Sequence, residues 1–364
     1  MLCFSSPIPS SPETGWRSLG KHMEFFKDRR THITITVCLL SFCLLYVFLT
    51  SYIGFTPLFS LPYQPCTLSK KCNVTDNKDA LEAALSEVSM GNKTVIIAIV
   101  NKAYVEGDKP MLDLFLDSFW LGEDTRKLVD HLLLVAVDET SFERCKFLRL
   151  YCYRLQMDDG VDANGEKVYM SDSFIKMMWR RTLFLGEVLK RDYSFIFTDT
   201  DVMWLRNPFP MLSQNERIDL QISTDNFNGD EWSEDNPINT GFYFIRSNNK
   251  TISLFDAWYA MKSNAVGLKE QDVLLNMMHE GVFKELGLTV RFLDTNYFSG
   301  FCEDSEDFKA VRTVHANCCR TIDAKLTDLM AVIHDWERFK RASTNESIST
   351  ARSSHVACSD SWKS

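Results

Sequence analysis

The chain has 364 residues and a formal net charge of −9, with 45% hydrophobic, 24% charged and 12% aromatic residues. This length accommodates a membrane anchor and one catalytic domain, and this composition excludes a chain that is disordered throughout. Lysine and arginine form no strongly basic block, which argues against a nucleic-acid partner, whereas an anionic substrate stays compatible through a bound divalent cation.

Residues 33–55 contain no Lys, Arg, Asp, Glu or His. As a helix they would span about 34 Å, which matches the hydrocarbon core of a bilayer. The basic residues Lys27, Arg29 and Arg30 precede the run, so the positive-inside tendency predicts a single-pass type II membrane protein with a lumenal C-terminal body. A cleaved signal peptide is the alternative, but this run starts later and is longer than its typical apolar region.

Sequons and cysteines fit a lumenal body. Four N-glycosylation sequons begin at Asn73, Asn92, Asn249 and Asn345. Eight cysteines follow the anchor, namely Cys66, Cys72, Cys145, Cys152, Cys302, Cys318, Cys319 and Cys358. Their full pairing cannot be read from the sequence. We expect Cys302 to bond Cys318 or Cys319, because closing this short loop would fix the segment that carries His315.

The expected organisation has five parts: a cytosolic tail (1–32), a signal anchor (33–55), a stem with a short helix at 80–88 (56–90), a catalytic domain (91–340) and a loosely ordered Ser/Thr-rich tail (341–364). Within the catalytic domain, uninterrupted apolar runs predict buried strands, and apolar residues three or four apart predict helices. In chain order these are strand 94–100, helix 111–120, strand 131–137, helix 142–150, helix 173–191 and strand 193–197. Their alternation predicts an α/β domain.

The triplet Asp199-Thr200-Asp201 directly follows the last of these strands and is the only D-x-D in the sequence. Carboxylates at the carboxyl end of a buried strand face the crevice where open α/β sheets bind ligands. Two such groups can share one Mn²⁺ or Mg²⁺ and leave positions for diphosphate oxygens and water. An exposed acidic turn is the alternative, but the apolar run at 202–205 indicates that the triplet lies against the body.

The stretch 197–208, FTDTDVMWLRNP, resembles the signature of the plant nucleotide-diphospho-sugar transferases of glycosyltransferase family 77, which includes xylosyltransferases of pectin and arabinosyltransferases of extensin. Similar motifs follow in order at 239–242, 270–274 and 314–319, so the resemblance covers about residues 94–340. It implies a GT-A fold with a mostly parallel, Rossmann-like mixed sheet, a Golgi membrane location, and a Mn²⁺-dependent reaction that retains anomeric configuration. It also implies a pentose donor, such as UDP-arabinose or UDP-xylose, and a glycan or glycoprotein acceptor.

The resemblance extends to individual residues. It places a metal ion on Asp199, Asp201 and His315, and the donor sugar beside Asn239 and Gly241. It places Gln271 nearest to the anomeric carbon and Asp272 where it positions hydroxyl groups. Simpler interpretations stay open, with 239–241 as a turn before a strand and the acids at 270–272 as a helix cap.

Position alone suggests two more residues. Arg180 lies on the helix before the D-x-D strand and could meet a diphosphate, although Lys176, Arg180 and Arg181 could equally form a solvated helix face. Trp232 lies in the polar loop 226–236, where its ring could stack on a sugar or a base.

Together these observations predict a metal-dependent glycosyltransferase. The alternatives are a nucleotide-sugar hydrolase, a catalytically inactive carbohydrate-binding or scaffolding relative, and a receptor-like surface protein. The intact Asp199, Asp201 and His315 argue against an inactive relative. We expect Asp201→Asn to abolish transfer and to change stability little, because the amide keeps the size of the carboxylate.

Overall fold

The computed structural model describes residues 39–41, 77–157, 165–167, 170–305, 307–342 and 352–363. The chain divides into units of residues 1–74 and 75–364. Among the described residues, no helix has the length and apolar character needed to cross a membrane. The predicted anchor at 33–55 lies outside the described residues except for 39–41, and everything below concerns the second unit.

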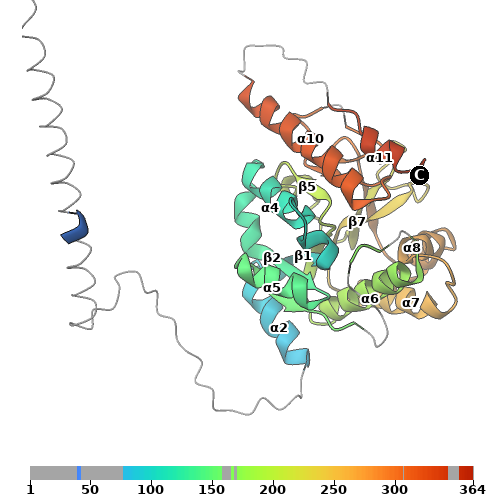
Figure 1. Ribbon diagram of the computed structural model, residues 1–364. Helices are drawn as coiled ribbons and strands as arrows, with labels where there is room; N and C mark the ends of the chain where they lie inside the picture. The colour runs from blue at the N-terminus through green and yellow to red at the C-terminus, as the bar shows by residue number, and fades with distance from the viewer. Residues whose placement is uncertain are drawn as a thin grey trace, which may run out of the picture. The chain divides into compact units, whose positions relative to one another are not determined.

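Strands and helices alternate through the first half of this unit (Figure 1). The strands are β1 (Thr94–Val100), β2 (Leu132–Ala136), β3 (Tyr151–Arg154), β4 (Ser194–Thr198), β5 (Val202–Trp204), β6 (Leu220–Thr224), β7 (Ile238–Ile245), β8 (Val290–Leu293), β9 (Phe298–Gly300) and β10 (Thr313–His315). The α-helices are α2 (Asn77–Val88), α3 (Lys102–Val105), α4 (Met111–Leu121), α5 (Glu139–Phe147), α6 (Asp172–Leu189), α7 (Asn249–Ala260), α8 (Glu270–His279), α9 (Val282–Glu285), α10 (Ile322–Arg341) and α11 (Val356–Asp360). Short 3-10 helices are η1 (Arg126–His131), η2 (Phe209–Met211) and η3 (Met261–Ser263).

The strands form two sheets. The larger has seven strands in the order β3-β2-β1-β4-β7-β6-β8, and the smaller has the order β5-β10-β9. Strands β3, β2, β1 and β4 run parallel to one another, and β8 is parallel to β6. Only β7 runs antiparallel to both of its neighbours, β4 and β6. This mixed, mostly parallel sheet confirms the predicted α/β class.

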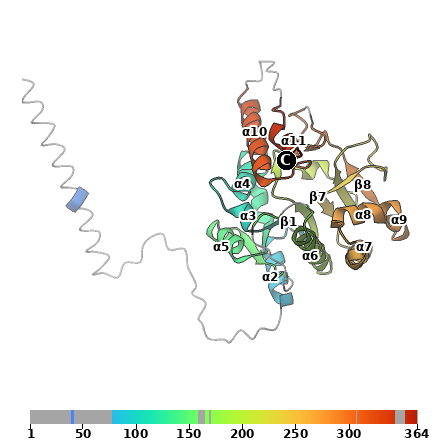
Figure 2. The same cartoon turned by 45° about the vertical axis from the view of Figure 1, so that its right-hand side comes forward.

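Helices cover both faces of the larger sheet. Alternate residues of a strand face opposite sides, and β1 shows the consequence. Its Val95 and Ile97 belong to a core shared with α6 and α7, while Ile96 and Ala98 belong to a second core shared with α4 and α10. Figures 1 and 2 show the same division, with α6 and α7 on one side and α4 and α10 on the other. An apolar run without polar interruptions is what such a strand requires.

Three boundaries differ from the sequence-based expectation. Helix α2 buries Leu81, Leu85 and Val88 in the first core, so this part of the expected stem belongs to the folded body. Residues 239–241 lie inside β7 rather than in a turn before it. The expected loose tail contains α11 and packs on α10, because Cys358 forms a disulfide bond with Cys319.

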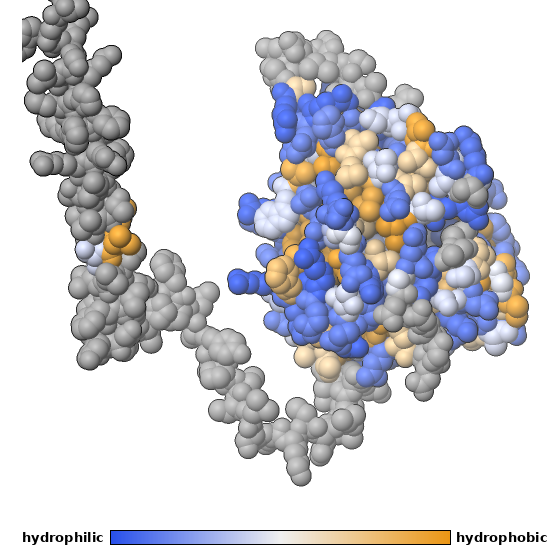
Figure 3. All heavy atoms as spheres, in the orientation of Figure 1, coloured by the Kyte–Doolittle hydropathy of each residue, from blue (hydrophilic) through white to orange (hydrophobic). Residues whose placement is uncertain are grey.

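The surface carries both polar and apolar side chains. On the face in Figure 3 the outline is mostly polar, and apolar side chains gather toward the middle. Three tryptophans on the described surface are half exposed, namely Trp120 at 53%, Trp232 at 50% and Trp362 at 51%.

Candidate active site

A cavity of about 360 Å³ opens at the carboxyl ends of the central strands. β1 pairs with β2 on one side and with β4 on the other, so the chain order reverses between β1 and β4. Such a switch point is where open α/β sheets bind ligands. The cavity is lined from several elements, by Asn101 after β1, Asp199 and Asp201 after β4, Gly241 in β7, Arg181 in α6 and Gln271 in α8.

Three candidate metal ligands converge on this cavity. One ligand atom from each of Asp199, Asp201 and His315 lies within 4.8 Å of the others. Strand pairing causes this, because His315 of β10 lies opposite Val202, the residue after Asp201. Within the described chain, the buried Oδ1 of Asp201 has no hydrogen-bond partner, although buried carboxylate oxygens normally have one. Two carboxylates and an imidazole therefore fit a Mn²⁺ or Mg²⁺ ion.

Lys325 of α10 neutralises Asp201. Its Nζ lies 2.6 Å from Oδ2 of Asp201, while Nε2 of His315 lies 3.3 Å from Oδ1 without forming a hydrogen bond to it. Burial alone raises the pKa of Asp201, but Lys325 and His315 outweigh burial and hold this pKa well below its usual range. The pKa of Asp199 is raised, chiefly by burial and against the opposing effect of Arg181. The two carboxylates therefore differ in how readily they take up a proton.

Arg181 connects the D-x-D triplet to helix α8. Its buried guanidinium donates to Oδ1 of Asp199 at 3.0 Å, to Oγ1 of Thr240 at 3.3 Å, and to Oε1 of Glu270. Glu270 is 2% exposed, and among the described residues its Oε2 has no hydrogen-bond partner. Because a buried carboxylate needs such a cation, Arg181 fixes Asp199 and Glu270 relative to each other.

Asp225 lies directly after β6 and binds the side-chain amides of two asparagines. Its Oδ1 accepts hydrogen bonds from Nδ2 of Asn239 at 2.7 Å and from Nδ2 of Asn317 at 2.8 Å. Oδ1 of Asn239 accepts from the backbone N–H of Gly241 at 2.8 Å. Both ends of the Asn239 amide are thus engaged within the protein, and Asn239 holds Asp225 and the backbone of β7 in place.

Gly241 provides space for the metal ligands. A Cβ atom at this position would lie 2.3 Å from Cε1 of His315 and 2.9 Å from Oδ2 of Asp199. Its carbonyl also accepts the N–H of Asp199 at 2.7 Å. The close approach of β7 to the D-x-D triplet therefore requires glycine.

Of the two predicted catalytic residues, Gln271 lines the cavity and Asp272 is not among its lining residues. The N–H and Oγ1 of Thr240 donate to Oε1 of Gln271 at 3.1 and 3.2 Å. This leaves Nε2 of Gln271, a hydrogen-bond donor, for a ligand. Asp272 lies near Lys269, with 4.0 Å between Oδ1 and Nζ, and burial raises its pKa.

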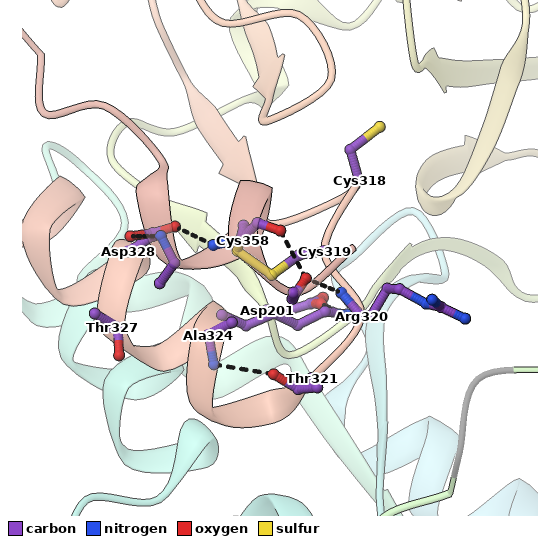
Figure 4. The surroundings of a disulfide bond; sticks show 12 residues. Asp201, Cys318, Cys319, Arg320, Thr321, Ala324, Thr327, Asp328 and Cys358 are labelled. Atoms are coloured by element: carbon purple, nitrogen blue, oxygen red, sulfur yellow. Dashed lines mark hydrogen bonds and ion pairs between the residues drawn. A yellow bond between two sulfur atoms is a disulfide. The ribbon is translucent and has the colours of Figure 1, made fainter. Parts of the chain in front are cut away.

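Disulfides hold the segment that carries His315. Cys302 is bonded to Cys318, which confirms one of the two predicted pairings, and Cys319 is bonded to Cys358. Figure 4 shows that the side chains of the adjacent Cys318 and Cys319 point apart, and Cys318 has a positive φ of 53°. A third disulfide joins Cys145 to Cys152. Two other cysteines, Cys66 and Cys72, lie outside the described residues.

Residues 127–329, more than half of the chain, match the family described as nucleotide-diphospho-sugar transferase. The chain belongs to this family. It is a glycosyltransferase, which confirms the enzyme class predicted from the sequence.

Two relatives and one solved structure are similar to this transferase. An uncharacterized protein of Arabidopsis thaliana is 55% identical to this transferase over 78% of this chain and 84% of its own length. The β-arabinofuranosyltransferase RAY1 of the same plant is 26% identical over 60% of this chain and 41% of its own length. The structure of mouse xyloside xylosyltransferase 1 matches with 14% identity and a TM-score of 0.39, over 63% of this chain and 99% of that one.

Two residues proposed from the sequence lie away from the cavity of this transferase. Nε of Arg180 donates to the carbonyl of Gln156 at 3.0 Å, and the neighbouring Arg181 enters the cavity instead, because successive residues of a helix point in different directions. Trp232 lines a separate hollow that also contains Arg291. Neither Arg180 nor Trp232 is among the described residues that line the main cavity.

Other residues of the cavity were missed from the sequence. Asp225 follows the buried strand β6 as Asp199 follows β4, so the same signal could have identified it. Glu270 belongs to the motif at 270–274, but the sequence predicts no role for it beyond that motif and the helix start. Lys325 and Arg181 carry no local signal, because their roles depend on contacts with Asp201 and Asp199 that span 124 and 18 residues.

Proposed function

We propose that this transferase moves a pentose, such as arabinose or xylose, from a nucleoside diphosphate to a hydroxyl group of a glycan or glycoprotein. The proposed reaction depends on Mn²⁺ or Mg²⁺ and retains the configuration of the anomeric carbon. The observation that carries the proposal is the convergence of Asp199, Asp201 and His315 at the switch point of the sheet.

In this proposal Asp199, Asp201 and His315 hold the divalent cation. When bound, such a cation supplies positive charge that stabilises the departing nucleoside diphosphate. The buried Oδ1 of Asp201 supports this assignment, since a ligand ion would give it the partner that it lacks in the described protein. Lys325 adds a second cation beside the same carboxylate, where it can contact a diphosphate oxygen.

Other residues that line the cavity would hold the sugar. Nε2 of Gln271 and the carboxylate of Asp225 offer a donor and an acceptor to sugar hydroxyls, since both residues line the cavity. Arg181 and Asn239 would not contact the substrate themselves. They hold Asp199 and Asp225 in position through hydrogen bonds. Asp272 is retained in the proposal as a residue that positions the acceptor, from its place on α8 next to Gln271.

The choice of a pentose and the retention of configuration rest on resemblance. RAY1 is named a β-arabinofuranosyltransferase, and the plant family that the motifs resemble acts on arabinose and xylose. A donor screen decides between sugars. The purified full-length chain would be given UDP-arabinose, UDP-xylose and UDP-galactose, with Mn²⁺ or with a chelator, and released UDP would be counted with and without acceptor glycans.

Three variants of the proposed metal ligands test the metal assignment: Asp201→Asn, Asp199→Asn and His315→Ala. Loss of a metal ligand should lower transfer at least about a hundredfold. Near-normal turnover of Asp201→Asn at low Mn²⁺ would overturn the metal assignment. Donor turnover without any need for an acceptor would identify a hydrolase, and nucleotide binding without turnover would identify an inactive relative.

We also propose that the protein resides in the Golgi membrane, anchored by residues 33–55 with residues 91–340 in the lumen. Three disulfide bonds in the second unit support an oxidising compartment. Protease treatment of sealed vesicles tests the topology. The catalytic domain should resist digestion until detergent is added, and digestion in intact vesicles would show the opposite orientation.

A further inference from the structure

The C-terminal segment 352–363 is fixed to the part of the chain that carries His315. Its helix α11 is joined to Cys319 by the disulfide at Cys358. Oδ2 of Asp328 accepts the N–H of Cys358 at 2.8 Å, and Oγ of Ser361 accepts the N–H of Arg320 at 3.1 Å. Figure 4 shows Asp328 next to Cys358 beside the disulfide, with the Arg320 side chain extending away from it.

A second group of contacts fixes the start of the same segment. The side chain of Arg352 is 7% exposed and forms an ion pair with Asp304. Nε2 of His355 lies 2.9 Å from Oδ2 of the same carboxylate, and the imidazole stacks on Phe301 with 3.6 Å between ring centroids. Both ends of the segment are therefore held, which leaves little freedom in the position of its last residues.

These contacts place Trp362 at the cavity. Trp362 lines the cavity together with Cys318 and Arg320, and it is 51% exposed. Its Nε1 donates to the carbonyl of Cys318 at 2.7 Å. The bond of the indole N–H is thus made within the protein, and the exposed part of the residue is its apolar ring.

Arg320 accompanies this ring. Its guanidinium carbon lies 5.1 Å from the ring centroid of Trp362, a distance that suits a cation–π contact. The side chain is exposed, and no carboxylate pairs with it among the described residues. A ring with an exposed apolar surface next to free N–H donors suits a sugar, because a sugar has C–H groups on its ring faces and hydroxyl groups at its edge.

We propose that Trp362 is the surface on which a sugar ring of the acceptor stacks, with Arg320 donating hydrogen bonds to its hydroxyl groups. This inference rests on the proposed function, since it supplies the acceptor for the same reaction. It replaces Trp232, which lines another hollow. The donor-side groups Asp199 and Asp201 directly follow β4, whereas Trp362 lies in the C-terminal segment, so donor and acceptor would be held by different parts of the chain.

The test compares Trp362→Ala and Trp362→Phe with Trp120→Ala in the full-length chain. Trp120 is a matched control, because it is equally exposed and lies beside an arginine, with Arg126 at 4.2 Å from its ring centroid, but it does not line the cavity. The probes are UDP with Mn²⁺, measured by calorimetry, and the methyl glycosides of arabinose, xylose and galactose, measured by saturation-transfer NMR with and without UDP.

We expect Trp362→Ala to weaken saccharide binding about tenfold or more, as loss of an aromatic stacking partner does. Trp362→Phe should keep most of the affinity, Trp120→Ala all of it, and UDP affinity should be unchanged throughout. Unchanged saccharide binding in Trp362→Ala, or no binding of any of these saccharides to the wild type, would overturn the assignment. So would a loss confined to UDP, which would show that the ring holds the nucleotide base.

The same experiment distinguishes failure of the proposed function from failure of the stacking surface. If UDP with Mn²⁺ does not bind the wild type while saccharide binding still depends on Trp362, the stacking surface stands and the donor assignment falls. A second pair of variants checks the role of the segment. Cys319→Ser/Cys358→Ser should reproduce the saccharide defect of Trp362→Ala, whereas Cys145→Ser/Cys152→Ser, which removes a disulfide away from the cavity, should not.

Discussion

Lys325 and Asp201 form an ion pair whose Nζ–Oδ2 distance is 2.6 Å, although 124 residues separate them in the chain. Burial lowers the pKa of Lys325, but Asp201 outweighs burial, so the pKa is raised and the ammonium stays charged. A divalent cation on Asp201 would compete with this ammonium for the same carboxylate. The pair therefore joins metal binding to the position of Lys325.

Lys325→Met should change two affinities in opposite directions. Without nucleotide, Mn²⁺ should bind several-fold more tightly, because no ammonium competes for Asp201. With Mn²⁺ saturating, UDP should bind about tenfold more weakly, because a charged donor to the diphosphate is lost. Calorimetry measures both affinities. Lys340→Met, on the same helix with its Nζ bonded to the carbonyl of Leu121, should change neither, and parallel changes in Lys325→Met would contradict this account.

Arg181→Met should destabilise the protein, whereas Arg180→Met should not. The first change leaves the buried Glu270 without its cation, which should lower the free energy of unfolding by about 3 kcal/mol or more. Arg180 donates to a backbone carbonyl at the surface, so its loss should cost less than about 0.5 kcal/mol. Urea denaturation measures both. Arg181→Met/Glu270→Leu should recover part of the loss, and equal stability of the two single variants would refute the importance of the buried pair.

Gly241→Ala should impair metal binding. The new Cβ would collide with the ring of His315, so that ring and the Asp199 carboxylate must move apart. We expect Mn²⁺ affinity, followed by electron paramagnetic resonance, to fall at least about tenfold. Gly186→Ala is the matched control, because its Cβ would make an ordinary 3.4 Å contact with Phe255. If both variants bind Mn²⁺ like the wild type, β7 does not approach the site this closely.

Tyr104 should make stability fall at alkaline pH. Burial raises its pKa to about 12 in the folded protein, whereas a tyrosine in the unfolded chain titrates near about 10. Between these values the unfolded state loses a proton that the folded state keeps, so unfolding becomes more favourable as the pH rises. Tyr104→Phe should reduce this dependence, which urea denaturation at several pH values between about 10 and 12 would show. An identical pH dependence in both proteins would contradict the burial of this phenol.

Much of the sheet was predictable from the sequence, because β1, β2 and β4 are buried on both faces and require continuous apolar runs. Asp199 and Asp201 were predictable for a related reason, since they stand where such a run ends. The contribution of β7 was harder to read. Its eight residues are all buried, yet three polar or small residues interrupt the apolar pattern. Asn239 faces Asp225, Thr240 faces α8, and Gly241 faces the metal ligands.

Long-range electrostatic contacts explain most of what was missed. Lys325 lies on an amphipathic helix where a lysine normally faces solvent, and only the fold brings it to Asp201. This contact also changes one expectation. Asp201→Asn leaves the partly buried ammonium of Lys325 without its carboxylate, so we now expect it to lower stability as well as activity. The C-terminal segment was interpreted as loose from its Ser/Thr content, which says nothing of the disulfide at Cys358.

The position of β7 in the middle of the sheet affects which parts of the protein unfold locally. Its backbone is hydrogen-bonded to β4 on one side and β6 on the other, so the amides of Tyr243 and Phe244, which are paired with both neighbours, should exchange with solvent only when the whole sheet unfolds. The rim at Arg320 and Trp362 depends on side-chain contacts and one disulfide. Hydrogen exchange should therefore be slow on the donor side and faster at this rim. The rim can then adjust to acceptors of different shape while the residues around the donor stay fixed.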